Sequence, residues 1–174
     1  MPPRISEPAQ MENPFWAFSL KVYGHKGVKD ACLALQDRFG ADVNILLFLC
    51  WRNSIGLPDP TAGRIQDMME AIATINRDVI APLRKIRTIL PGKDMAGAPE
   101  TRKKVLEAEL SAEQMAQATL FSAFPAPTPP PSPESEEKTV HTALVLYFRA
   151  LGIGETGLDE ARPLLSALAD GVYA

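Results

Sequence analysis

Apolar residues are concentrated in one stretch of the chain, Ala41–Gly56. Asp42 can cap the N-terminus of a helix there and Gly56 can end it, with roughly three to four turns between them. Apolar side chains would cover nearly every direction around this helix, whereas a surface helix leaves one face polar. They are Val43, Ile45, Leu46, Leu47, Phe48, Leu49, Cys50 and Trp51. The pattern predicts a central helix surrounded by the others. A buried strand is the alternative, but the length and the capping residues favour a helix.

Two helical segments precede this stretch. Asn13 and Pro14 form a helix start signal, an N-cap side chain followed by proline at the first helical position. An aromatic-rich segment follows as far as Tyr23. After the turn at residues 24–27, apolar residues recur at intervals of three and four, as in an amphipathic helix that ends at Gly40.

Two long helical patterns follow the central helix. Apolar residues keep a helical period from Ile65 to Leu90, for about seven turns. Pro82 predicts a kink in this helix, because proline lacks a backbone N–H and its ring clashes with the preceding turn. A second long helix is predicted over Glu100–Phe124. We expect the two to form a long, kinked helical hairpin.

The remaining segments complete the predicted domain organisation. Residues 1–12 contain three prolines without periodicity and are expected to be a disordered tail. Residues 13–124 form the main helical domain, and residues 125–136 form a proline-rich linker with extended geometry. Residues 137–174 carry two amphipathic patterns, which should be C-terminal helices that pack on the main domain. The sequence therefore predicts an all-α, single-domain bundle of about six helices.

Composition and charge narrow the class of protein. A chain of 174 residues fits one domain, and its net charge of −3 gives no reason to expect a polyanion partner for the whole surface. Cys32 and Cys50 lie within apolar helical patterns, where thiols pack as small apolar groups, so no disulfide framework is expected. The sequence shows neither a secretory signal nor a segment long enough to span a bilayer. We expect a cytoplasmic protein without a membrane partner.

Three blocks of the sequence, taken in order, resemble a known family. They are the start Asn13–Trp16, the stretch Asp42–Leu47 with Trp51 close behind, and Pro82–Arg84 followed by Glu107–Glu113. They are similar to those of small, mostly proteobacterial, all-helical proteins catalogued as a domain of unknown function. The similarity covers most of residues 13–124. It implies a bacterial, helical, cytoplasmic protein without an assigned activity, and it provides no catalytic residues.

No reaction motif or metal-binding pattern is present. His25 and His141 lie far apart, and neither has a glutamate three positions before it, as helical di-iron sites require. Cys32 and Cys50 lack the spacing of a zinc finger. A Cys50 nucleophile is disfavoured, because flanking apolar residues indicate an inert, packed thiol. We therefore predict no metal and no cofactor, and we favour a non-catalytic protein over an enzyme.

A basic segment covers the expected end of the hairpin. Residues Arg84–Lys104 include seven basic and two acidic side chains, which could meet phosphate or an acidic partner. No aromatic residue occurs between Trp51 and Phe121, so this segment lacks local stacking platforms for single-stranded nucleic acid. A solvated hairpin end is favoured over a nucleic-acid site.

The best candidate binding site combines aromatic, cationic and amide side chains. Its members are Trp16, Trp51, Arg52, Asn53 and Arg84. Tryptophan and arginine anchor many interfaces, and a buried arginine needs a carboxylate such as Glu109 or Glu113. A satisfied polar network that locks the helices together is the favoured interpretation. If the network is instead partly open, the same residues would line an apolar cleft that suits an acidic amphiphile or a peptide.

Two functions follow from these observations. The favoured one is a helical interaction, adaptor or regulatory protein that has a protein partner and no catalytic activity. The alternative is a binder of a small acidic or amphiphilic molecule, or an enzyme acting on one, with an apolar cavity between helices.

Overall fold

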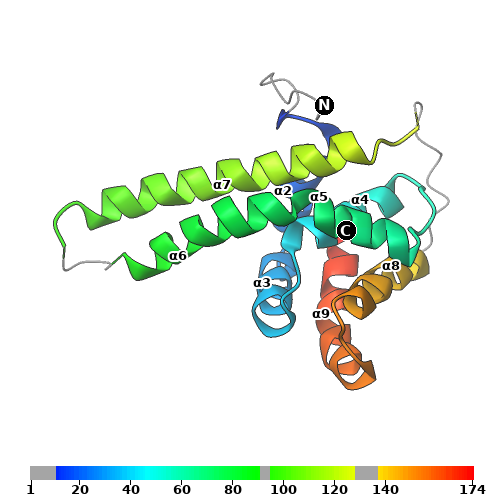
Figure 1. Ribbon diagram of the computed structural model, residues 1–174. Helices are drawn as coiled ribbons and strands as arrows, with labels where there is room; N and C mark the ends of the chain where they lie inside the picture. The colour runs from blue at the N-terminus through cyan, green and yellow to red at the C-terminus, as the bar shows by residue number, and fades with distance from the viewer. Residues whose placement is uncertain (1–10, 91–94, 128–136) are drawn as a thin grey trace.

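The computed structural model of the protein describes residues 11–90, 95–127 and 137–174, and every regular element among them is helical (Figure 1). The helices are α2 (Pro14–Tyr23), α3 (Val28–Phe39), α4 (Val43–Ser54), α5 (Ala62–Ile75), η1 (Asn76–Ile80), α6 (Ala81–Ile89), α7 (Ala98–Ala123), α8 (Glu137–Ala150) and α9 (Glu155–Tyr173). This architecture confirms the predicted all-α, single-domain bundle. The predicted N-terminal tail and proline-rich linker lie largely outside the described residues.

Capping residues set several helix starts at the positions that the sequence indicates. The Asn13 side chain accepts a hydrogen bond from the backbone N–H of Trp16 at 3.0 Å, directly before α2. Asp42 caps α4 by accepting bonds from two backbone N–H groups, those of Asn44 at 2.8 Å and Ile45 at 3.2 Å. Each bond satisfies a donor that has no partner within its own helix.

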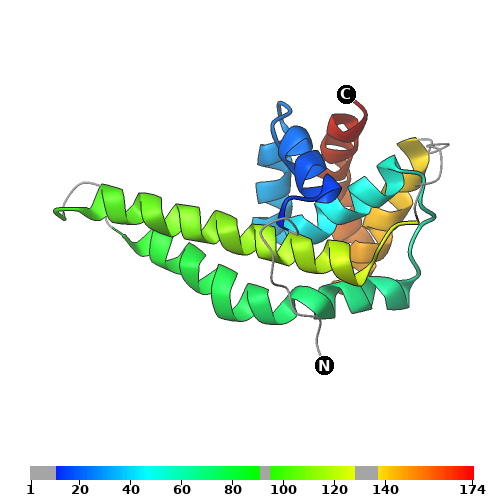
Figure 2. The same ribbon diagram turned by 90° about the horizontal axis from the view of Figure 1, so that it is seen from above.

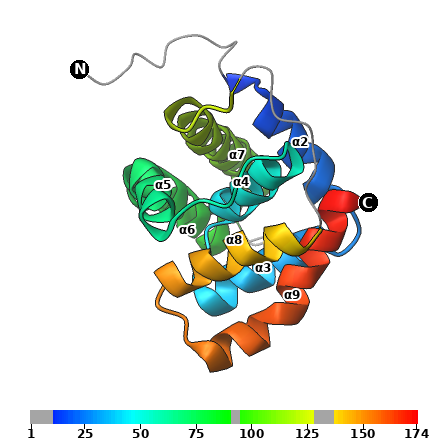
Figure 3. The ribbon, with the colours of Figure 1, turned by 90° about the vertical axis from the view of Figure 1, so that its right-hand side faces the viewer.

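Helix α4 lies at the centre of the fold, as its apolar pattern predicts. Nine of its twelve residues are buried, and it packs against α2, α3, α7, α8 and α9. Viewed along the hairpin, α4 lies between α7 on one side and α3, α8 and α9 on the other, and α5 also packs on α8 (Figure 3). An aromatic cluster covers its C-terminal half, with ring centroids between 4.9 and 6.3 Å apart. The free thiols Cys32 and Cys50 are buried in this core.

The long hairpin consists of a continuous helix, formed by α5, η1 and α6, that packs along α7. Helix α6 has no buried residue, and its principal packing partner is α7. The end formed by α6 and the start of α7 extends beyond the rest of the molecule (Figures 1 and 2). The π-helical turn η1 ends two residues before Pro82. The wider turn accommodates the proline ring and its missing N–H, so the irregularity lies one turn before the proline.

The last two helices lie beside the central helix. Helix α8 packs on α4, α5 and α9, and helix α9 packs on α3. The Tyr147 hydroxyl of α8 accepts a hydrogen bond from the backbone N–H of Asp42 at 2.7 Å, which ties α8 to the start of α4. Among the described residues, no helix combines the length and apolar character needed to cross a membrane.

Candidate functional site

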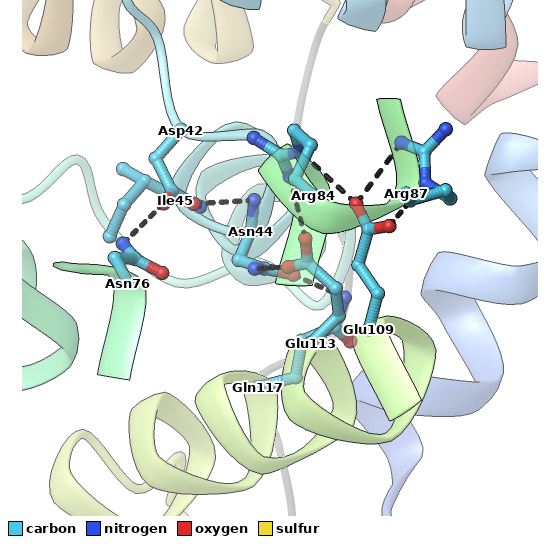
Figure 4. A network of polar contacts seen from close by, with 9 residues as sticks. All are labelled: Asp42, Asn44, Ile45, Asn76, Arg84, Arg87, Glu109, Glu113 and Gln117. Carbon is cyan, nitrogen blue, oxygen red and sulfur yellow. Dashed lines mark hydrogen bonds and ion pairs between the residues drawn. The ribbon is translucent and has the colours of Figure 1, made fainter. Parts of the chain in front are cut away.

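A polar network joins α4 to the two arms of the hairpin (Figure 4). Glu109 accepts hydrogen bonds from Nε of Arg84 at 3.1 Å and from Nε of Arg87 at 2.5 Å. Glu113, one turn further along α7, accepts from Nη2 of Arg84 at 2.9 Å and from the Asn44 side-chain amide. The spacing of the two arginines on α6 and the two glutamates on α7 places each pair on one helical face. We call these four ion-paired residues the brace.

The Glu109 carboxylate is held in its charged form. Glu109 is only 6% exposed. Burial raises its pKa, but hydrogen bonds from Arg87 and Arg84 outweigh that effect and hold the pKa below its ordinary value. The hydrogen bond between Arg87 and Glu109 also raises the pKa of Arg87. Loss of one partner would leave a charge in a poorly solvated position.

The Asp42 and Glu113 carboxyls are in a different electrostatic state. Burial is the largest influence on both and raises the pKa of each. Hydrogen bonds to Asp42 from the backbone of Ile45 and Asn44 and from the Asn76 side chain only partly offset burial. At Glu113, the nearby Asp42 charge raises the pKa further. The protein's own donors therefore do not fully compensate these two carboxylates.

Amide side chains extend the network on both sides of Glu113. Asn44 accepts a hydrogen bond from Nε2 of Gln117 at 3.0 Å through Oδ1. Asn76, the first residue of η1, donates to Oδ2 of Asp42 at 2.5 Å, while its own Oδ1 is buried without a hydrogen-bond partner in the described structure. Single π-helical turns are frequent at functional sites.

A cleft of about 480 Å³ lies beside this network, between α4, α5, η1, α7 and α8. Its polar wall includes Asp42, Asn44, Asn76, Arg84 and Glu113. Apolar side chains from α4, α5 and η1, the Tyr147 ring of α8 and Leu151 also line it, together with the polar Gln36, Gln66 and Glu70. In the described ranges, no three His, Cys, Asp or Glu side chains are grouped so that they could hold a metal ion.

The hairpin exposes an unusual share of the large apolar side chains. Ten such side chains are strongly exposed in the described structure, and seven lie in or between η1 and α7. These seven are Val79, Ile86, Ile89, Met95, Leu106, Leu110 and Met115. Basic side chains accompany them, since Lys85, Arg102, Lys103 and Lys104 are exposed on the same arms. We call these apolar and basic side chains the hairpin surface.

The comparison with known proteins identifies the family. A family model described as a protein of unknown function, DUF2390, matches residues 14–120. The chain belongs to the DUF2390 family. The match confirms the resemblance seen in the sequence, to a domain of unknown function. No curated protein and no solved structure matches this DUF2390 chain.

The site residues proposed from the sequence lie in separate parts of the DUF2390 chain. Arg84 belongs to the brace, whereas Trp51, Arg52 and Asn53 lie at the opposite end of α4. Trp51 packs in the aromatic cluster, with its ring centroid 5.5 Å from that of Phe121. Asn53 accepts a hydrogen bond from the hydroxyl of a tyrosine in α9.

The remaining two residues proposed from the sequence are Arg52 and Trp16. Arg52 donates to the backbone carbonyl of Phe124 at 3.5 Å, and its guanidinium carbon lies 5.8 Å from the centroid of the Phe48 ring. Of the two arginines proposed from the sequence, only Arg84 makes the expected pairing with Glu109 and Glu113, and Arg87, which was not proposed, also pairs with Glu109. Trp16 is half-buried on α2. The structure does not gather the five candidates around one opening.

Three residues that belong both to the polar network and to the cleft lining, Asp42, Asn44 and Asn76, were not proposed as site residues from the sequence. Asp42 was identified only as a helix cap, and Asn44 and Asn76 were not singled out. The polar Asp42 and Asn44 in the most apolar stretch of the chain were an available signal, because buried polar groups need partners. Asn76 gave no comparable signal in the sequence.

Proposed function

We propose that this DUF2390 protein is a non-catalytic interaction protein whose hairpin surface docks a partner protein with acidic and apolar groups. The observation that carries the proposal is the concentration of exposed apolar side chains on the extended hairpin, seven of the ten such residues in the described structure. Exposed apolar side chains gathered on one element commonly mark sites of protein association, whereas scattered ones need no explanation.

The energetics of α6 support docking. Ile86 is 42% exposed and Ile89 is 66% exposed, and no residue of α6 is buried. Burying an aliphatic side chain fully stabilises a complex by roughly 1.5–3 kcal/mol before the costs of association. A partner that covers these residues would supply the apolar packing that α6 lacks within the chain.

The charge of the hairpin surface defines the partner further. Lys85, Arg102, Lys103 and Lys104 are exposed on the same arms as the apolar residues, together with the acidic Asp78, Glu100 and Glu107, and the basic cluster at the start of α7 favours an acidic partner electrostatically. The brace holds α6 against α7 with ion pairs of 2.5–3.1 Å. A hairpin fixed in this way loses little conformational freedom on binding.

The proposal is tested by affinity capture of the full chain from its host, with matched surface variants. Ile86→Ser with Ile89→Ser removes apolar groups from the hairpin surface, whereas Leu20→Ser removes a side chain that is 55% exposed on α2. We expect one protein at fixed stoichiometry to be retained by the wild type and by Leu20→Ser, and lost with the hairpin variant. Equal retention by all three proteins would contradict the proposal.

A further inference from the structure

The cleft beside the brace has the dimensions of a small-molecule site and is separate from the exposed hairpin surface. Its volume of about 480 Å³ is within the range of roughly 300–1,000 Å³ that is typical of ligand pockets. Met69, Ile72 and Ile80 give it an apolar wall, and Asp42, Asn76 and Glu113 contribute polar groups. An apolar wall with a few convergent polar groups is the usual composition of such a site.

The charged groups that line the cleft are mainly acidic. The lining includes three carboxylates, Asp42, Glu70 and Glu113, and one cation, Arg84. Arg84 already donates to Glu109 and Glu113. An anionic ligand would therefore meet an excess of negative charge, with the guanidinium already engaged.

Glu113 keeps acceptor capacity in the cleft. Each oxygen of Glu113 accepts one hydrogen bond in the described structure, and a carboxylate oxygen can accept two. Asn76 Oδ1 is buried without a hydrogen-bond partner among the described residues. That oxygen has almost no accessible surface, so Glu113 provides the acceptor that a ligand in the cleft can reach.

We propose that this cleft binds a small organic cation, with an ammonium or amidinium group against Glu113 and Asp42 and an apolar body against Met69, Ile72 and Ile80. This ligand class differs from the acidic amphiphile that the sequence suggested. The pKa of each of the two carboxyls is raised, since burial outweighs the protein's own donors, and a bound cation would supply the missing compensation. The inference goes beyond the proposed docking function and does not depend on it.

The test uses isothermal titration calorimetry of the purified full chain with three cations: 1,5-diaminopentane, 4-aminobutylguanidine and 2-phenylethylamine. Glutarate and 1,5-pentanediol are the matched anionic and neutral controls. We expect saturable binding of at least one cation and none of either control. Absence of saturable binding by all three cations, or equal binding of glutarate or the diol, would overturn the proposal.

Two pairs of variants locate the binding. Ala73→Trp fills the cleft from an exposed position of α5, and Ala71→Trp places the same side chain on an exposed position of that helix outside the lining. Glu113→Gln removes a charge of the cleft, and Glu107→Gln removes an exposed charge of α7 outside the lining. We expect loss of binding with Ala73→Trp and affinity weaker by at least about tenfold with Glu113→Gln, as for a charge pair of roughly 1.4 kcal/mol or more.

The outcomes separate this inference from the docking function. Unchanged affinity in Ala73→Trp, or equal losses in both members of either pair, would place binding outside the cleft and overturn the inference. Thermal unfolding of each variant without ligand shows that it is folded. Partner capture through Ile86 and Ile89 is measured without any added cation, so either proposal can fail while the other holds.

Discussion

Glu109 and Glu113 lie one turn apart on α7, yet their environments shift the two pKa values in opposite directions. Glu109 receives hydrogen bonds from two arginines, which outweigh its burial and lower its pKa. Glu113 shares Arg84 with Glu109 and lies near the charge of Asp42, so burial dominates and raises its pKa. Both glutamates pair with Arg84, but the charged form is favoured at Glu109 and disfavoured by burial at Glu113, which lines the cleft.

The brace should contribute measurably to stability. Replacing Glu109 by alanine leaves Arg84 and Arg87 without their shared carboxylate, and we predict a loss of about 2–3 kcal/mol in the free energy of unfolding. This value is below the range for fully buried pairs because the arginine side chains are 35% and 25% exposed. Urea denaturation measures the loss. Glu107→Ala, at an exposed position of the same helix, should change stability by less than about 0.5 kcal/mol. Equal effects of the two substitutions would contradict a role for the brace.

The opposite pKa shifts predict opposite pH dependences of stability. A raised folded-state pKa makes Glu113 destabilising at neutral pH, and that penalty is relieved as pH falls towards its ordinary value of 4.5. The lowered pKa of Glu109 makes it stabilising above 4.5, and that contribution is lost as pH falls through its folded-state pKa.

Denaturation of the wild type and two glutamine variants at several pH values tests these signs. Between pH 7 and about 4.5, the stability of the wild type relative to Glu113→Gln should increase on acidification. Below about 4.5, its stability relative to Glu109→Gln should decrease. If the stability of the wild type relative to each variant changed in the same direction on acidification, the two glutamates would share one environment and the account would be contradicted.

At the scale of elements, local sequence signals account for the helices and their ends. Asn13 and Asp42 cap the helices that they were expected to cap, because each side chain accepts from backbone N–H groups directly after it. The all-round apolar character of α4 predicted its central position. Pro82 indicated an irregularity but not its form, since a sequence does not specify which hydrogen-bond register relieves the proline.

The candidate site was less predictable because it depends on contacts between distant segments. The pairing of Arg84 with Glu109 and Glu113 followed from their positions on two long, adjacent helices. Asn76 contacts Asp42 from the π-helical turn, and Tyr147 contacts the same residue across 105 positions of sequence. Neither contact follows from the periodicity of a single helix. Arg52 was grouped with Arg84 by residue type, although Arg52 lies near the C-terminal end of α4 and Arg84 pairs with Glu113, which bonds to Asn44 near the start of that helix.

The exposed face of α6 should be dispensable for folding. We predict that Ile89→Ser changes the unfolding free energy by less than about 0.5 kcal/mol, because this side chain is 66% exposed. Ile80→Ala, at a position that is 3% exposed in η1, should cost about 2–4 kcal/mol. Chemical denaturation of both variants provides the comparison. A loss of more than about 1 kcal/mol in Ile89→Ser would indicate that its side chain supports the fold instead of a partner.

At the scale of the whole molecule, the protein combines a compact group of helices around α4 with a hairpin that extends away from it (Figure 2). The group around α4 buries the aromatic cluster and both thiols. In the described part of the hairpin's far end, apolar and basic side chains are exposed and α6 has no buried residue. This division of the molecule is the basis for assigning partner docking to the hairpin.

The most direct test of that assignment is site-specific photocrosslinking in the host cell, with a photoreactive residue at position 89 or at position 20. Ile89 and Leu20 are similarly exposed, at 66% and 55%, but only Ile89 belongs to the hairpin surface. The account predicts a discrete crosslinked product with a different protein from position 89 and none from position 20. The product should decrease when Lys85, Arg102, Lys103 and Lys104 are replaced by glutamine. Absence of a product specific to position 89, or a product made only of two copies of this chain, would contradict the central claim.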